Sequence, residues 1–214
     1  LESLYKNGYL ISTVYTQPPK KSERGQKINK SPIQGISETL NIDFRCPDSL
    51  KNNNEEFEFI KKMEADLAIV VAYGKIIPQE YLSLTKKGFI NIHGSILPRW
   101  RGAAPIQRSI MNLDNETGVS IMKINEKLDS GPVSNIYKIK LESKDNFQEV
   151  SERLSLLASD KISDEIDNIL EDKVKFIDQD NSKATYAKKI EKKEGKINWD
   201  DEAIKILGKI NGLF

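Results

Sequence analysis

The sequence predicts an α/β fold, with a mostly parallel Rossmann-like sheet flanked by helices. Strand and helix patterns alternate through residue 112, which is typical of strands joined by helical crossovers. Residues 67–72 form a continuous apolar run, as expected of a parallel strand covered on both faces. The first predicted strand, residues 9–16, follows only the end of a helix. We therefore expect the first strand of the sheet to be missing before Leu1.

Capping and turn residues define the predicted elements in order. Asn7-Gly8 ends a first helix, and Ser31-Pro32 begins a short helix that runs to about Leu40. The turn at residues 128–132 separates two strands that we expect to be antiparallel. The remaining predicted elements are strands at 42–45, 65–73, 89–93, 117–124 and 133–141, and helices at 52–63, 78–84, 103–111, 146–171 and 200–210.

Bulk composition limits the classes of function that are open to this chain. Its 214 residues suffice for one large domain or a domain with an incomplete second one. A net charge of +1 gives no global attraction to nucleic acid, so any such binding needs a local basic patch. The single cysteine cannot form an internal disulfide, which favours the cytoplasm. We expect no membrane-spanning helix and no signal peptide, because no suitable apolar run is present.

A local basic patch does occur in the polar segment at residues 17–32. Its side chains have no hydrophobic periodicity, and we expect a loop there. One interpretation is a solvated, mobile loop, and the other is an arm that binds phosphates. The segment carries five cations against one anion (5 − 1 = +4), namely Lys20, Lys21, Arg24, Lys27 and Lys30 against Glu23.

Two polar side chains interrupt the apolar strand predicted at residues 89–93. Asn91 and His93 are two residues apart, so on a strand they point to the same face. Ligands of parallel α/β sheets gather where strands end, and His93 is the only histidine in the chain. A histidine that only caps the strand or packs in the core is the alternative.

Asp129, in the turn at residues 128–132, is the third candidate. It is either a turn former or the carboxylate partner of His93, which would orient the imidazole and favour its protonated form. With Asn91, the pair suits acyl transfer to an amine, which needs an oxyanion stabilised and a proton moved. No dinucleotide or nucleoside-triphosphate motif is present, and cysteine and histidine are too few for an ordinary zinc site.

Two adjoining segments carry a resemblance to a known family. Residues 91–98 (Asn-Ile-His-Gly-Ser-Ile-Leu-Pro) and 99–108 (Arg-Trp-Arg-Gly-Ala-Ala-Pro-Ile-Gln-Arg) closely resemble the signature of the methionyl-tRNA formyltransferase family. All folate-dependent formyltransferases share the Asn, His and Asp trio, whereas the second segment points to the enzymes that act on tRNA. The match also includes residues 16–18, 70–74, 116–122 and 128–131.

The resemblance implies transfer of the formyl group of 10-formyltetrahydrofolate to the α-amine of methionyl initiator tRNA. It also implies a formyltransferase fold and a cytoplasmic monomer that uses no metal and binds no membrane. Arg24 is the best candidate for the key tRNA-binding arginine. The implied site residues are catalytic Asn91, His93 and Asp129; tetrahydrofolate-binding Ser95, Ile96, Leu97 and Pro98, with Val71, Ala72, Tyr73 and Gly74 beside the pterin; and tRNA-binding Arg24, Lys20, Lys21 and Lys27.

The family pattern also predicts the domain organisation. We expect a catalytic domain at residues 1–175, truncated at its N-terminus, and a linker and helix at 176–214 that lead toward an absent C-terminal barrel domain. Arg99 and Arg101 serve either the loop structure or the acceptor end of the tRNA. Two rivals stay open: a different folate formyltransferase or formylfolate hydrolase, and a non-catalytic RNA-binding fragment.

Overall fold

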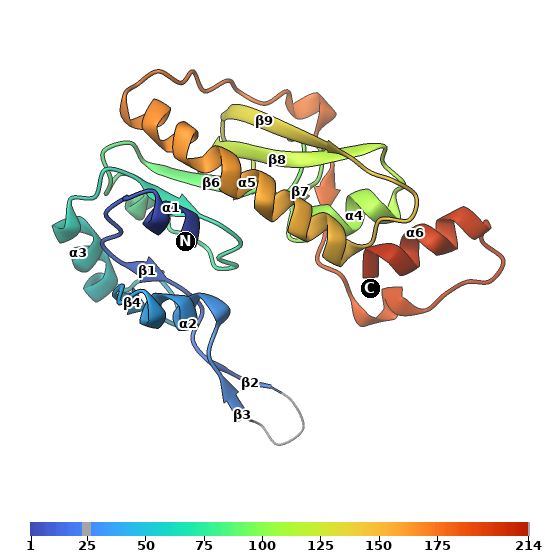
Figure 1. Ribbon diagram of the computed structural model, residues 1–214, viewed down its shortest axis with the longest axis horizontal. Coiled ribbons are helices and arrows are strands. Elements are labelled where there is room, and N and C mark those ends of the chain that lie inside the picture. The colour runs from blue at the N-terminus through green and yellow to red at the C-terminus, as the bar shows by residue number, and fades with distance from the viewer. Residues whose placement is uncertain (23–26, 214) are drawn as a thin grey trace.

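A four-stranded sheet forms the centre of the molecule (Figure 1). The computed structural model describes residues 1–22 and 27–213, and within residues 20–28 it describes only the backbone of the two strands. The first two strands of the sheet pair in parallel, and the others pair antiparallel. In spatial order the strands are β5 (Ala68–Val70), β6 (Phe89–His93), β8 (Glu116–Lys123) and β9 (Val133–Lys140). The predicted α/β class and the antiparallel pairing of β8 with β9 are confirmed.

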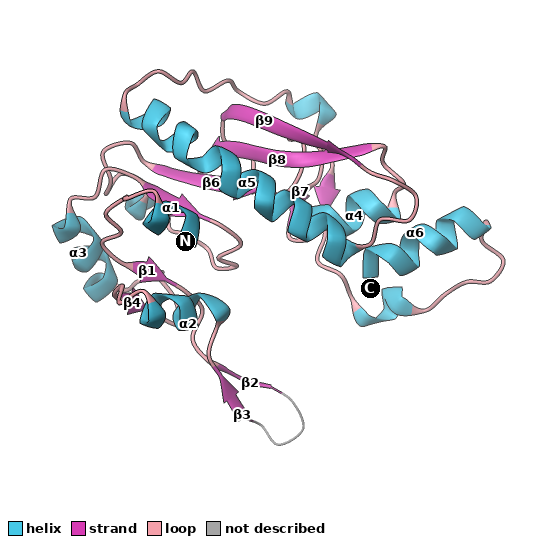
Figure 2. Ribbon diagram, in the orientation of Figure 1, coloured by secondary structure: helices cyan, strands magenta, loops and turns pink. Residues whose placement is uncertain are grey.

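Three smaller strand pairs surround this sheet. Two are parallel: β1 (Val14–Tyr15) with β4 (Phe44–Arg45), and β7 (Arg101–Gly102) with β10 (Tyr186–Ala187). The third is an antiparallel pair, β2 (Lys20–Ser22) with β3 (Lys27–Asn29), which extends away from the rest of the molecule (Figure 2). The prediction of a loop at residues 17–32 was wrong for these strands. Backbone hydrogen bonds pair these strands. The lysine-rich sequence shows no alternation of apolar and polar residues from which the strands could be predicted.

Two of the predicted strands are shorter than the apolar runs that suggested them. Only Val14 and Tyr15 of residues 9–16 are paired, and β5 keeps three residues of residues 65–73. Val71 is 60% exposed and Ala72 has a φ of 47°, so the chain turns away from the sheet directly after β5. The expectation of a strand covered on both faces is therefore wrong at Val71. The apolar run in the sequence extends two residues beyond Val70, the last paired residue of β5.

The helix predicted from Ser31-Pro32 and the helix predicted from residue 146 begin where the sequence indicated, whereas those predicted from residues 103 and 200 begin two and three residues later. The Ser31 side chain accepts a hydrogen bond from the Gln34 N–H, and Asn146 forms a capping box with Glu149. The predicted helix at 78–84 is instead one 3₁₀ turn. The α-helices are α1 (Glu2–Lys6), α2 (Pro32–Thr39), α3 (Asn54–Met63), α4 (Pro105–Met111), α5 (Phe147–Leu170) and α6 (Ala203–Leu213), and the 3₁₀ helices are η1 (Gln79–Tyr81), η2 (Asn181–Lys183) and η3 (Lys192–Gly195).

Apolar clusters cover both faces of the central sheet. On one face, Ile90 of β6 packs with Val150 and Leu154 of α5, the long helix that crosses the sheet in Figure 1. On the other face, Phe89 packs with Ile60 of α3. Successive residues of β6 thus point to opposite faces, as the period of a strand requires. The pairing of β6 on both edges and its packing on both faces fix the residues at its end.

The segment after residue 175 lies against the body of the fold. β10 pairs with β7, and Arg108 of α4 forms an ion pair with Glu194 at 2.5 Å. The Arg108 guanidinium also donates to the backbone carbonyl of Lys188. The division into a catalytic domain at residues 1–175 and a linker at 176–214 stays a prediction.

Candidate active site

Asn91, His93 and Asp129 meet at the carboxyl end of β6. The Asn91 amide donates to Asp129 Oδ1 at 3.4 Å, and His93 Nδ1 lies 3.8 Å from Asp129 Oδ2. The His93 side chain is 6% exposed and that of Asp129 is 14% exposed. The structure thus brings together the three residues that the sequence singled out. Two of them, His93 and Asp129, are thirty-six residues apart in the sequence.

The backbone of Trp100 orients the His93 ring. His93 Nε2 lies 2.9 Å from the Trp100 carbonyl oxygen, which can only accept a hydrogen bond. Nε2 therefore carries a proton in every charge state of the ring. Nδ1 faces the Asp129 carboxylate and is the atom left for chemistry.

Trp100 is held in turn by Asp114 and Thr185. Its φ of 61° is unusual for a bulky residue, its indole N–H donates to Asp114 at 2.7 Å, and its backbone N–H donates to the Thr185 hydroxyl. Arg99 forms an ion pair with Asp114 and stacks over the indole. Although burial alone raises the pKa of Asp114, the hydrogen bonds from Arg99, Trp100 and Asn112 bring it below its usual value. These contacts of Arg99 are the ones expected of a residue that serves the loop structure.

Asp129 is fixed by groups that the sequence did not reveal. The Gly102 N–H donates to its Oδ2 at 2.8 Å, at a glycine with a φ of 121° whose Cβ would lie 2.7 Å from the Ala187 carbonyl. The Gln179 side-chain amide donates to the carbonyl oxygens of Asp129 (3.0 Å) and Gly131 (2.7 Å). Gln179 lies in a polar stretch without periodicity fifty residues after Asp129, and no local signal marks it.

The predicted folate segment at residues 95–98 is mostly turned inward. The Ser95 hydroxyl donates to the Arg99 carbonyl, and the side chains of Ser95 and Leu97 are 0% and 4% exposed. Ile96 and Pro98 are partly buried. Ser95 and Leu97 therefore shape the loop after His93, and their side chains present little surface to a ligand.

The predicted pterin wall at residues 71–74 follows β5 directly. Val70 pairs with Asn91 in the parallel strand β6, so this loop leaves the sheet at the same end of the strands as the trio. Val71 and Ala72 are exposed there, and the Gln17 side chain donates to the carbonyl of Tyr73. Burial raises the pKa of the Tyr73 phenol to about 12, so it stays neutral. Val71 and Ala72 are thus exposed apolar residues that directly follow the strand residue paired with Asn91.

Three of the four predicted tRNA-binding residues belong to the β2–β3 hairpin. The backbones of Lys20, Lys21 and Lys27 belong to its two strands. Arg24 lies outside the described residues. The structure therefore places three of the four residues on a projecting element without testing their contacts.

Neither a metal-binding cluster nor a membrane-spanning helix occurs among the residues that the structure describes. Residues 1–22 and 27–213 hold no cluster of three or more His, Cys, Asp or Glu side chains arranged to bind a metal ion. Within the same ranges, no helix combines the length and the apolar character that crossing a membrane requires.

Comparison with known proteins identifies the family. The model of the family described as "Formyl transferase" matches residues 2–166. The methionyl-tRNA formyltransferase of Pelagibacter ubique is 65% identical over 214 residues, which is all of this chain and 69% of that protein. This chain belongs to the methionyl-tRNA formyltransferase family. The family member from Coxiella burnetii (strain CbuK_Q154) is 40% identical over all of this chain and 68% of its own length.

Solved formyltransferase structures share the fold of this family member. A sugar N-formyltransferase from Shewanella matches with a TM-score of 0.71 and 23% identity over 87% of this chain and 72% of its own. An N-formyltransferase from Helicobacter canadensis, solved with folinic acid and dTDP-3-aminofucose, gives a TM-score of 0.73 at 17% identity, covering 99% of this chain and 74% of that one. The Rossmann-like formyltransferase fold is thus confirmed.

Proposed function

We propose that this chain transfers the formyl group of 10-formyltetrahydrofolate to the α-amine of methionyl initiator tRNA. The observation that carries the proposal is the meeting of Asn91, His93 and Asp129 at one strand end, with contacts of 3.4 and 3.8 Å. The relatives at 65% and 40% identity, both methionyl-tRNA formyltransferases, support this acceptor. An amide, an imidazole and a carboxylate in contact are the groups that acyl transfer to an amine needs.

The residues present fit a folate donor. A flat pterin ring needs an apolar surface, and the exposed wall at Val71 and Ala72 supplies one beside Asn91. Ile96 and Pro98 are the partly exposed members of the segment after His93. When bound, 10-formyltetrahydrofolate supplies an activated formyl group on nitrogen. The protein's part is to hold that carbonyl against the trio.

In the proposed reaction the neutral α-amine attacks the formyl carbon, and the carbonyl oxygen becomes an oxyanion. Asn91 Nδ2 and His93 Nδ1 donate hydrogen bonds to this oxygen. Since Nε2 already donates to Trp100, His93 can donate through Nδ1 only as an imidazolium. The Asp129 carboxylate lies 3.8 Å from Nδ1, on the side of the ring that faces the reaction.

Asp129 also assists the removal of the proton that the attacking nitrogen loses. As the bond between the formyl carbon and the donor nitrogen breaks, the donor nitrogen receives a proton. The acceptor amine loses one proton and the donor nitrogen gains one, so the exchange is neutral overall. Asp129 Oδ2 stays fixed meanwhile by the Gly102 N–H. The chain needs no nucleophile of its own, because the amine attacks directly.

The proposal extends to binding of the tRNA and to the state of the protein. Lys20, Lys21 and Lys27 lie on the projecting hairpin, where cations suit contact with phosphates, and Arg24 belongs to the same segment. We take the enzyme to be a cytoplasmic monomer. Sedimentation of the purified chain tests the monomer, and a dimer at working concentration would contradict it.

Gln179 gives a prediction about how Asp129 is held. Replacing Gln179 by alanine removes the donor to the Asp129 and Gly131 carbonyls and leaves the buried Arg101 without its main acceptor. A small displacement of a catalytic group lowers turnover, and we expect kcat to fall by roughly 10- to 100-fold. The KM for the formyl donor should stay within about threefold of the parent value, since the Gln179 side chain bonds to Arg101, Asp129 and Gly131 rather than to the predicted pterin wall.

The variant Gln179→Glu separates positioning from general stability. Its carboxylate still accepts from Arg101 but cannot donate to the two carbonyls, so kcat should fall while the melting temperature is largely kept. Gln148→Ala, at an exposed position on α5, is the matched control. Unchanged kcat in Gln179→Glu would show that Gln179 does not position Asp129.

The function itself is tested by offering different acceptors. The purified chain is given 10-formyltetrahydrofolate with methionyl initiator tRNA, with uncharged tRNA, with a nucleotide-linked amino sugar, or with no acceptor. Formylation of only the charged tRNA is expected. Formylation of the sugar amine, or release of formate without an acceptor, would favour the rival formyltransferase or hydrolase. Donor binding without any turnover would favour a non-catalytic fragment.

A further inference from the structure

Thr185 bonds to both of the peptide groups that flank Trp100. The Trp100 N–H donates to the Thr185 hydroxyl at 2.9 Å, and the Arg101 N–H donates to the Thr185 carbonyl, also at 2.9 Å. The Thr185 N–H donates in turn to the Pro98 carbonyl at 3.3 Å. A residue that lies eighty-five positions after Trp100 in the sequence therefore holds the backbone of the loop at residues 98–101.

One of these two peptide groups is the group that orients His93. The Trp100 carbonyl, 2.9 Å from His93 Nε2, belongs to the same planar peptide unit as the Arg101 N–H. The carbonyl and the N–H of a trans unit point in opposite directions, so the bond to His93 and the bond to Thr185 fix a single orientation. Rotation of this unit away from Thr185 would also turn the carbonyl away from Nε2.

The backbone of Trp100 needs this support because its conformation is unfavourable. Its φ of 61° lies in the left-handed region, where the Cβ of a bulky residue is crowded. Such conformations persist only where surrounding contacts over-determine them. The bond from the indole to Asp114 acts on the side chain, whereas the bonds to Thr185 act directly on the two backbone groups.

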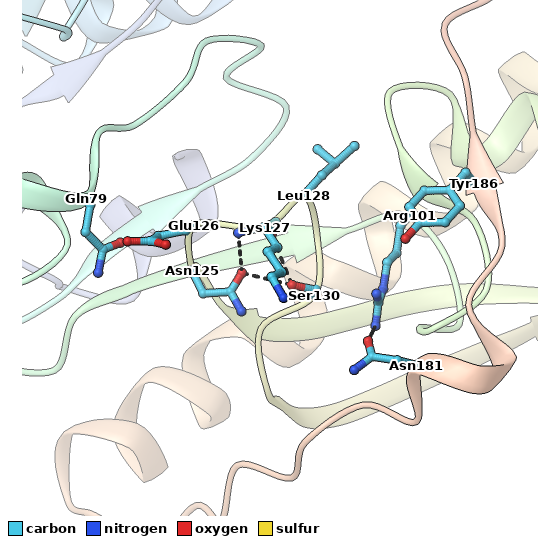
Figure 3. A pocket seen from close by; sticks show the side chains of 9 residues that line it. All are labelled: Gln79, Arg101, Asn125, Glu126, Lys127, Leu128, Ser130, Asn181 and Tyr186. Carbon is cyan, nitrogen blue, oxygen red and sulfur yellow. Dashed lines mark hydrogen bonds between the residues drawn. The ribbon is translucent and has the colours of Figure 1, made fainter.

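Thr185 is itself fixed by contacts on either side of it. Strand β10 begins at the next residue and pairs with β7. Before Thr185 in the sequence, Asn181 accepts a hydrogen bond from the Arg101 guanidinium at 2.9 Å, and Figure 3 shows Arg101 beside Tyr186 and bonded to Asn181. The Arg101 side chain is 3% exposed, so this connection is buried. A support held on both sides can keep a functional group in place.

We propose that Thr185 is a positioning residue for the reaction, which fixes the Trp100 carbonyl and thereby keeps the proton of His93 on Nε2. Nδ1 then stays turned toward Asp129. Thr185 acts through Trp100 and not on the reacting atoms. The effect on turnover rests on the proposed function, whereas the state of the His93 ring can be observed without substrates.

The single histidine of the chain makes this ring directly observable. In protein without a histidine tag, made with isotopically labelled histidine, every imidazole signal in nitrogen NMR belongs to His93. In the neutral ring, the parent should carry its proton on Nε2 alone. Thr185→Val replaces the hydroxyl by a methyl group, and it should raise the Nδ1–H form from below detection to about a tenth of the population.

Two further variants complete this measurement. Thr185→Ser keeps the hydroxyl and should keep the Nε2–H form. Thr13→Val is the matched control, since it removes a threonine hydroxyl that bonds to the Asp43 carbonyl next to β1. Thr185→Ala removes the same acceptor with a smaller side chain, and it takes the place of Thr185→Val if that protein does not fold.

Turnover should follow the state of the ring. In Thr185→Val, kcat for formylation should fall roughly 10- to 100-fold, with both KM values within about threefold of the parent, because a small displacement of a catalytic group lowers turnover. In the His93→Ala background the same change should have no further effect, since the group through which Thr185 acts is gone. A merely structural role would lower kcat by the same factor in both backgrounds.

The outcomes separate this inference from the proposed function. A parent chain that formylates no methionyl-tRNA refutes the proposed function, while its His93 ring still tests the role of Thr185. An active parent whose Thr185→Val variant keeps both kcat and the Nε2–H form refutes only the inference. A loss of kcat that is equally large in the His93→Ala background also overturns it.

Discussion

Replacing Asp129 by asparagine is expected to lower kcat by roughly 10²- to 10⁴-fold, the range for loss of a proton-transfer group. The change keeps the size of the side chain and an oxygen that can accept from the Gly102 N–H. It removes the carboxylate that lies 3.8 Å from His93 Nδ1, and with it the proposed acceptor for the proton of the amine. The measurement is kcat for formylation of methionyl-tRNA at saturating donor.

Controls for Asp129→Asn separate chemistry from folding. The melting temperature should stay close to that of the parent, and Asp200→Asn, at an exposed position, should change neither quantity. A variant with full kcat would mean that Asp129 is only a turn former, which is the alternative that the sequence alone left open.

Gly131→Ala is expected to damage stability and activity together. A Cβ at Gly131 would overlap the backbone carbonyl of Lys123, far inside the 3.0 Å that real Cβ contacts respect. The turn after β8 must move, because the oxygen belongs to a paired strand and has no freedom to yield. Overpacking of this kind costs about 1–3 kcal/mol in the free energy of unfolding.

Activity should fall along with stability in Gly131→Ala, because Asp129 lies two residues away in the same turn. A shift of about 1 Å in a catalytic group lowers turnover by roughly 10²-fold. Denaturant unfolding and kcat measure the two effects. Gly195→Ala is the matched control, since an added Cβ there meets no atom within 4 Å. A Gly131→Ala protein with parental stability and kcat would show that the turn does not hold Asp129 in place.

The sequence could predict those parts of the candidate site that local side-chain patterns mark. The strand at residues 89–93 was predicted to the residue, because apolar alternation and the following Gly94 mark both of its ends. Its period of two put Asn91 and His93 on one face, and the turn residues around Asp129 marked the third member. The resemblance to the family supplied the donor and the acceptor.

The features that could not be predicted depend on backbone hydrogen-bonding groups and on contacts between segments that are far apart in the sequence. His93 is oriented by the carbonyl of Trp100, a group that every residue carries. Gln179 reaches Asp129 only because β10 brings the segment after residue 175 back beside β7. The β2–β3 hairpin likewise depends on backbone pairing between segments whose side chains show no strand pattern.

The central claim is that the trio acts on a formyl group passed from folate to methionyl-tRNA. Single-turnover formyl transfer with both substrates saturating, for the parent chain and His93→Ala, tests it most directly. The transfer rate should fall by roughly 10²- to 10³-fold, as expected for loss of one oxyanion donor. Binding of tetrahydrofolate, measured by calorimetry, should persist, because Val71 and Ala72 remain in place. An unchanged single-turnover rate in His93→Ala would contradict the claim.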